Sequence, residues 1–195
     1  MTISAFDIAI LGAGPVGRVL ALMLARVAPD PARIALLAGA SPAPVTPAAA
    51  IPVADPRVLA MNHGSRVLLE SLNAWPAKAA DILNIHVSQR GRLGRSVIQH
   101  TDFDVPQLGC VVAYSALHAK LEERVAASGV TLLSGPPAQI DGQDGDGVRI
   151  SQGDTALSCR IAVQSDGAGA SDLRRDYGQH ALLTTVHATL PRRGW

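Results

Sequence analysis

Aromatic residues are scarce in this sequence of 195 residues, at 3% of the chain. The scarcity excludes stacking platforms for nucleic-acid bases and argues against an aromatic-lined substrate pocket. Charged residues make up 17%, against roughly 25% in ordinary soluble domains, and the formal net charge is +1. These values exclude a disordered charged tail and a basic surface for nucleic acid. We therefore expect a folded domain that holds its ligand mostly through backbone groups.

Cysteine and membrane signals are also weak. Cys110 and Cys159 form no CxxC pair, and the six histidines form neither HxH nor HxxxH, so we expect buried free thiols and no metal site. Arg18 and Arg26 interrupt the longest apolar run, which excludes a membrane span there. A strand that begins by Phe6 leaves no room for a signal peptide, and this predicts a cytoplasmic location.

The first forty residues predict a strand–helix–strand unit. An apolar run over 6–11 ends in glycine, as a buried parallel strand does, and 18–26 reads as a largely buried helix. A second strand follows at 33–38, and the whole has the size of a parallel crossover. Residues 39–54 hold four prolines and no charge, which predicts an extended loop.

The remainder predicts further alternation of helices and strands. We expect helices at 57–72 and at 115–127, the second capped by Ser115, buried through Leu117, Leu121 and Val125, and ended by Gly129. The expected strands lie near 85–89, 95–99, 110–113, 130–133, 148–151, 156–163 and 181–190, with an acidic turn at 141–147 and a short helix at 172–177.

Three glycines between the first strand and the first helix form the motif Gly12-x-Gly14-x-x-Gly17. Gly12 suits a tight turn, Gly14 has no side chain to exclude a pyrophosphate, and Gly17 lets helix and strand approach closely. The helix N-terminus then presents free N–H groups to the phosphates. The motif predicts dinucleotide binding, and the alternative is a plain glycine turn.

The acidic partner expected for such a motif is missing. The second strand ends Leu37-Ala38-Gly39, and no Asp or Glu occurs between Asp30 and Asp55. The ribose hydroxyls would then depend on backbone groups, Ser41, Thr46 or water. A hydrogen bond to a charged group is worth roughly 1.5–3 kcal/mol, so its loss predicts about a ten- to hundredfold weaker affinity.

At this point the sequence resembles the FAD-dependent aromatic-ring hydroxylases, and among them the ubiquinone-biosynthesis type, similar to 2-octaprenyl-6-methoxyphenol hydroxylases. The likeness is collinear and covers essentially the whole chain. It is carried by 6–17, by 55–65 as D-x-R-x-x-A-x-x-x-G-S, by 85–91 against "HVSDRG", by 109–117 as G-x-V-V, and by 161–167 against "ADG".

The resemblance implies an α/β fold: a Rossmann-like FAD-binding domain at 1–180, built on a parallel sheet with a small β-meander or hairpin. It also implies that strands at about 84–113 contribute to a substrate-domain sheet, whose incomplete beginning is 181–195. The family's later G-D-A-x-H-x-x-x-P-x-x-G-x-G-x-N motif is absent. We therefore expect a truncated, N-terminal half of such an enzyme that lacks activity alone.

The resemblance also implies the cofactor site. It assigns the FAD pyrophosphate to the three glycines, a place near the flavin to Arg57, and cofactor contacts to Asp166 and Gly167; the full set is Gly12, Gly14, Gly17, Arg57, Asp166 and Gly167. From the residues alone, 166–167 reads as an ordinary turn. Ala170 stands where the family has serine, and no catalytic residue is nominated because the flavin carries the chemistry.

By resemblance, the complete enzyme is an FAD-dependent monooxygenase that hydroxylates a lipophilic polyprenyl phenol in ubiquinone biosynthesis, with NAD(P)H as reductant and O2 as oxidant. It implies peripheral contact with the cytoplasmic membrane face and association with other ubiquinone-biosynthesis proteins, without nucleic acid. Two alternatives stay open: another FAD/NAD-dependent oxidoreductase, and a non-catalytic dinucleotide-binding remnant.

Overall fold

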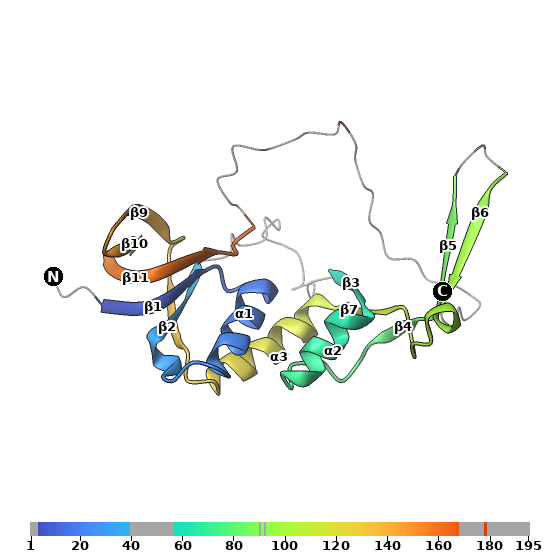
Figure 1. The fold of residues 1–195 in the computed structure, drawn as a ribbon, viewed down its shortest axis with the longest axis horizontal. Coiled ribbons are helices and arrows are strands. Elements are labelled where there is room, and N and C mark those ends of the chain that lie inside the picture. Colours follow the sequence, from blue (N-terminus) through green and yellow to red (C-terminus); the bar gives the residue numbers. More distant parts are fainter. Residues whose placement is uncertain (1–3, 40–56, 90, 92, 168–177, 179–195) are drawn as a thin grey trace, which may run out of the picture.

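A computed structural model describes residues 4–39, 57–89, 91, 93–167 and 178. Its main sheet has six strands in the order β8-β2-β1-β11-β10-β9. The first four of these are parallel, and β10 and β9 continue the sheet antiparallel (Figure 1). Their bounds are β1 Ser4–Leu11, β2 Ile34–Gly39, β8 Thr131–Gly135, β9 Gln139–Asp144, β10 Gly147–Gln152 and β11 Thr155–Gln164.

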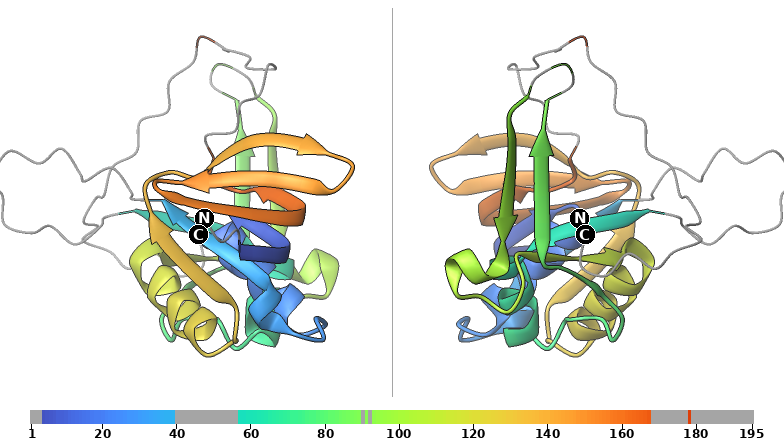
Figure 2. Two further views of the ribbon diagram at one scale, coloured as in Figure 1. Left: turned by 90° about the vertical axis from the view of Figure 1, so that its left-hand side faces the viewer. Right: turned by 90° about the vertical axis from the view of Figure 1, so that its right-hand side faces the viewer.

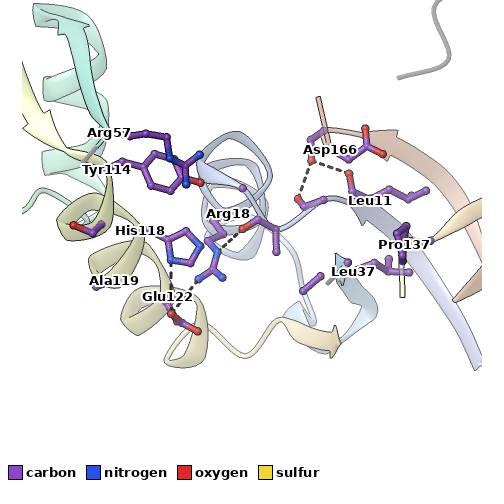
Figure 3. A pocket seen from close by; sticks show the side chains of 18 residues that line it. Leu11, Arg18, Leu37, Arg57, Tyr114, His118, Ala119, Glu122, Pro137 and Asp166 are labelled. Carbon is purple, nitrogen blue, oxygen red and sulfur yellow. Dashed lines mark hydrogen bonds and ion pairs between the residues drawn. The ribbon is translucent and has the colours of Figure 1, made fainter. Parts of the chain in front are cut away.

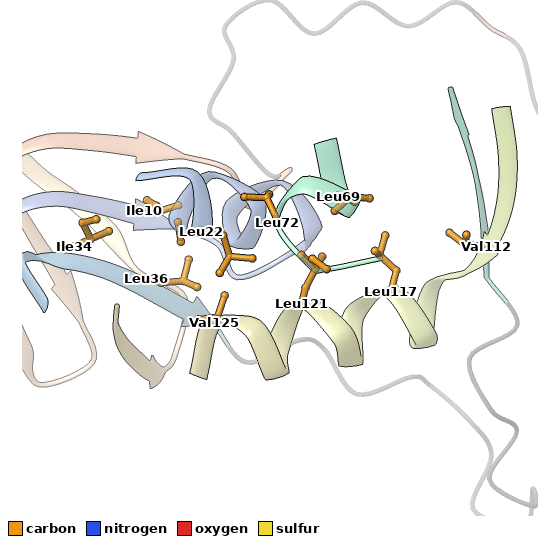
Figure 4. Close-up of a cluster of buried hydrophobic side chains, with 12 residues drawn as sticks. Ile10, Leu22, Ile34, Leu36, Leu69, Leu72, Val112, Leu117, Leu121 and Val125 are labelled. Atoms are coloured by element: carbon orange, nitrogen blue, oxygen red, sulfur yellow. The ribbon is translucent and has the colours of Figure 1, made fainter. Parts of the chain in front are cut away.

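Helices α1 (Pro15–Ala25), α2 (His63–Ser71) and α3 (Tyr114–Ala126) share one hydrophobic core, in which α1 packs on α3 and against β1 and β2 on one face of this sheet. The first core forms between them (Figure 4), and its largest members are Ile10, Leu22, Ile34, Leu36, Leu69, Leu72, Val112, Leu117, Leu121 and Val125. Leu117, Leu121 and Val125 are all buried, which confirms the apolar face predicted for this helix. The 3-10 turn η1 (Pro31–Arg33) lies between α1 and β2, and η2 (His100–Phe103) lies between two later strands.

The other face of the sheet carries a second core. Ala9, Leu11 and Leu37 on β1 and β2 pack with Val148 and Ile150 of β10. Because neighbouring residues of β1 and β2 enter opposite cores, both strands are buried on two sides, as their continuous apolar runs predicted. On this face, residues of β10 therefore pack with residues of β1 and β2 (Figure 2).

A smaller sheet and a hairpin lie beyond the helices. Strands β3 (Val58–Asn62), β7 (Gly109–Ala113) and β4 (Ala80–Ile82) form an antiparallel sheet in the order β3-β7-β4. Strands β5 (Asn84–Ser88) and β6 (Arg95–Gln99) pair with each other only, within the described residues, and extend away from the main sheet (Figures 1 and 2).

Several predictions about elements are corrected. The helix expected at 57–72 begins only at His63, because Val58–Asn62 pairs with β7 and the Asn62 side chain accepts a hydrogen bond from the Ser65 amide, 2.7 Å away. Ser115 does not cap α3, whose N-cap is Ala113 with no side-chain hydrogen bond. The turn expected at 141–147 is mostly strand, since β9 runs to Asp144.

Other predictions are confirmed or lie outside the described residues. Cys110 and Cys159 are free and buried, and burial raises the pKa of both thiols. The first helix is less buried than expected, because Val16 is 70% exposed and Met23 is 43% exposed. The loop at 40–54, the helix at 172–177, the strand at 181–190 and the boundary at residue 180 are not described, so the domain division stays a prediction.

Candidate functional site

Two of the three motif glycines are required by close packing. Gly12 has φ +111°, and a Cβ there would lie 2.6 Å from the Asp166 amide nitrogen. A Cβ on Gly17 would collide with the Gly12 carbonyl oxygen and lie 2.6 Å from the Ser165 hydroxyl. These contacts hold the glycine turn against the end of β11 and confirm that helix and strand approach closely here.

Gly14 differs from its two neighbours because nothing lies within 4 Å of a Cβ placed on it. It is the N-cap of α1, and no side chain there accepts a hydrogen bond from the first turn. The first amides of a helix have no partner within the helix, and they carry its partial positive charge. The turn therefore offers free donors beside open space, which is what binding of a phosphate group requires.

This open space is part of a cavity of about 780 Å³ at the carboxyl ends of β1, β2 and β11. Gly12, Gly14, Arg57 and Asp166 line it, so the fold brings together four of the six predicted residues (Figure 3). Gly17 lies behind the turn, and Gly167 follows Asp166 with φ +71°. Binding sites of open parallel sheets lie at this edge of the strands.

Ser165 connects β11 to the glycine turn. Its amide donates to the Leu11 carbonyl, 2.8 Å away, and its hydroxyl lies 3.0 Å from that oxygen and 2.9 Å from the Gly12 carbonyl oxygen. Asp166 comes next in the chain and is thereby fixed at the cavity rim. The sequence predicted Asp166 but did not predict the serine that positions it.

The opposite wall is a stack of side chains from Arg57, just before β3, and from α3. The Arg57 guanidinium lies 3.9 Å from the centre of the Tyr114 ring, and that ring stacks on His118 with centroids 5.8 Å apart. The Tyr114 amide also donates to the Arg57 carbonyl, 2.9 Å away. The low aromatic content gave no reason to expect a tyrosine in this cavity, and Tyr114 is the one Phe, Tyr or Trp among its described lining residues.

Arg18 and Glu122 complete the cavity between α1 and α3. The Arg18 side chain is only 7% exposed; its Nε donates to the Ala13 carbonyl at 2.6 Å, and a terminal nitrogen lies 4.0 Å from a Glu122 carboxylate oxygen. His118 Nδ1 lies 3.9 Å from the same oxygen (Figure 3). A sequence signal existed: Tyr114, His118 and Glu122 recur every four residues, on the helix face next to the buried apolar residues of α3.

The end of β2 forms the remaining wall without a carboxylate. Ala38 and Gly39 line the cavity, and the Ala38 carbonyl accepts from Nε2 of Gln152, 3.1 Å away. Gln152 is 5% exposed and also donates to the Pro136 carbonyl at 3.0 Å. The described end of β2 therefore brings no acidic side chain to the cavity. Ser41 and Thr46, the alternative ribose contacts, lie outside the described residues.

Several solved structures with a similar fold are hydroxylases or monooxygenases. The anhydrotetracycline hydroxylase OxyS from Streptomyces rimosus matches with TM-score 0.60, 20% identity, 83% of this chain and 32% of that one. The p-nitrophenol 4-monooxygenase PnpA from Pseudomonas putida matches with 0.58, 14%, 85% and 42%. The flavin-dependent monooxygenase PieE, solved with FAD and substrate, matches with 0.57, 18%, 81% and 29%.

These matches confirm the fold class, an α/β fold with a mixed sheet of mostly parallel strands. The chain spans 32%, 42% and 29% of the lengths of the three proteins. No family model and no curated protein matches the sequence. Within the described residues, no helix has both the length and the apolar character needed to cross a membrane.

Proposed function

We propose that this chain forms the FAD-binding part of an FAD-dependent monooxygenase that hydroxylates an aromatic ring. The observation that carries the proposal is the open approach to Gly14, at an uncapped helix N-terminus, inside a cavity that Asp166 and Arg57 also line. The fold likeness to flavin-dependent monooxygenases supports it. Because fold alone does not determine a reaction, the site residues carry the argument.

The cavity fits FAD in size and chemistry. Its volume of about 780 Å³ lies within the range of roughly 300–1,000 Å³ found for cofactor pockets. In this proposal Gly12, Gly14 and Gly17 form the pyrophosphate cradle, Asp166 and Gly167 contact the cofactor, and Arg57 lies near the flavin. Bound FAD, reduced by NAD(P)H, supplies the activation of O2.

The chain's own part in such a reaction is to bind and orient. The glycine turn and the first amides of α1 donate hydrogen bonds to phosphate oxygens, and the Ser165 contacts keep Asp166 at the cavity rim. The Arg57–Tyr114–His118 stack forms one wall of the cavity. None of these residues needs to act as a general base.

For the complete protein, we propose a lipophilic polyprenyl phenol of ubiquinone biosynthesis as the substrate, met at the cytoplasmic membrane face. What supports this finer proposal is the sequence resemblance over 55–65, 85–91, 109–117 and 161–167. The competing proposals are a different FAD/NAD-dependent oxidoreductase and a remnant that binds a dinucleotide without turnover. The chain spans about a third of its structural neighbours, and we expect it to bind FAD without hydroxylating by itself.

The first test is a titration of residues 1–195 with FAD, followed by quenching of flavin fluorescence, with NAD and FMN titrated alongside. Saturable binding of FAD that exceeds binding of NAD supports the proposal. Preference for NAD favours the other oxidoreductase. Absence of binding to all three by folded chain, with native circular dichroism as the control, contradicts the proposed cofactor site.

A further inference from the structure

Arg18 is a buried cation whose charge has little compensation. Its side chain is 7% exposed, yet it makes only one hydrogen bond within the described residues, from Nε to the Ala13 carbonyl. The terminal N–H groups donate none there, and they belong to a side chain that lines the cavity (Figure 3). A guanidinium has five donors in a fixed planar fork, so most of its donors are available to a ligand.

The position of Arg18 near the start of α1 makes its buried positive charge still less favourable. It is the fourth residue of the helix, its amide donates to the Gly14 carbonyl at 3.0 Å, and no acidic residue lies in the first turn. The N-terminal end of a helix is positive and disfavours a second positive charge. Glu122 is 59% exposed and 4.0 Å away, which is a weak partner for a buried charge. The positive end of the helix and the Arg18 guanidinium together favour the binding of an anion.

We propose that Arg18 is a ligand for the diphosphate of the bound dinucleotide, and that Glu122 competes with that diphosphate for Arg18. This inference rests on the proposed function of the cavity as a dinucleotide site. Arg18 and Gly14 line the same cavity from the same helix, so one diphosphate meets the free amides and the guanidinium together. Guanidinium groups bind phosphate oxygens through charge-assisted, paired hydrogen bonds.

The proposal also explains how the site binds without an acid at the end of β2. In most sites of this kind a carboxylate holds the ribose, whereas here the described end of β2 offers only backbone groups. Recognition therefore shifts from the ribose to the diphosphate. The expected ligand class is a nucleoside diphosphate or a dinucleotide, with adenosine alone bound weakly.

The test measures binding of ADP and of adenosine to residues 1–195 by calorimetry at two salt concentrations. We expect Arg18→Leu to weaken ADP binding about ten- to hundredfold, the value of a charge-assisted bond, and to leave adenosine binding unchanged. Its ADP affinity should also depend less on salt, because one charge contact is lost. Glu122→Gln should bind ADP several times more tightly. Arg26→Leu, at the C-cap of the same helix and exposed, is the matched control and should bind as the parent does.

The variants separate this inference from the proposed function. If the parent chain binds FAD and Arg18→Leu binds ADP equally well with the same salt dependence, the inference is wrong and the FAD site stands. If the folded parent binds neither FAD nor ADP, the proposed function fails with it. Should Arg18→Leu not fold, Glu122→Gln decides: ADP binding that is unchanged from the parent's or weaker overturns the inference.

Discussion

At the scale of single residues, glycine is needed at the three motif positions for different physical reasons. Gly12 and Gly17 are needed because a Cβ would meet backbone atoms, whereas Gly14 faces open space with an ordinary backbone conformation of φ −71°. The first two glycines therefore serve the fold. Gly14 has no structural reason of this kind, and its absent side chain matters only to a ligand.

This difference gives a prediction about Gly14→Ala. We expect it to keep the free energy of unfolding of the parent, because the new methyl group meets no atom, and to weaken FAD binding at least about tenfold, because the methyl enters the space of the phosphates. Gly145→Ala is the matched control, since its Cβ also meets nothing within 4 Å and Gly145 lies on the distant β9–β10 turn. Fluorescence titration and thermal unfolding of both variants measure the two effects.

Gly12→Ala should show the opposite pattern. The change forces a Cβ onto φ +111° and into the Asp166 backbone, so we expect it to destabilise the fold by about 1–3 kcal/mol, measured by urea unfolding. Equal loss of stability in Gly12→Ala and Gly14→Ala would contradict the division of roles.

At the scale of elements, the start of α2 is where sequence and structure differ most. The apolar residues of 58–61 fit a helical pattern, yet they form a strand because β7 offers an antiparallel partner. Asn62 ends the strand and is the N-cap of α2, where its side chain accepts a hydrogen bond from the Ser65 amide. At α3 the sequence suggests a cap that the structure does not show. Ser115 has a residue type typical of an N-cap, but the helix already begins at Tyr114.

A pair of substitutions tests these two assignments. Asn62→Ala removes a capping hydrogen bond and should lower the free energy of unfolding by about 1 kcal/mol. Ser115→Ala removes no cap and should change it by less than about 0.5 kcal/mol. Chemical denaturation of the two variants beside the parent gives both values, and a larger effect at Ser115 would restore the cap that the sequence suggested.

Local patterns predicted the elements whose signals are local. The strand, the glycine turn and the helix of residues 4–25 follow from apolar runs and glycine spacing, and so does the β10–β11 hairpin. Strands β3 and β4 depend on pairing with β7, a partner distant in sequence, and their short segments carry no pattern of their own. The same holds for the site: the glycines were predicted from their motif and Asp166 from the family resemblance, whereas Arg18 and Glu122 meet only when α1 packs on α3.

At the scale of the whole molecule, two cores share the same two strands. Ile10 and Leu36 face the helices, while Leu11 and Leu37, the next residues along, face β10 on the other side. A strand that loses one core loses the burial of one face, so we expect neither core to be stable without the other. The cavity at the carboxyl ends of these strands therefore depends on both cores.

We expect this shared architecture to give a single unfolding transition. Leu121→Ala in the first core and Ile150→Ala in the second, both at most 1% exposed, should each lower stability by about 2–5 kcal/mol, whereas the exposed Leu93→Ala should not. In a Trp195→Phe background, the fluorescence of Trp75 reports the first core, against which it packs, and far-ultraviolet circular dichroism reports the sheet. If the cores are coupled through β1 and β2, both signals change at the same denaturant concentration in every variant. Separate midpoints, with Ile150→Ala moving only the circular dichroism, would mean that the helical side folds without the β10 side, and the cavity would then no longer depend on the second core.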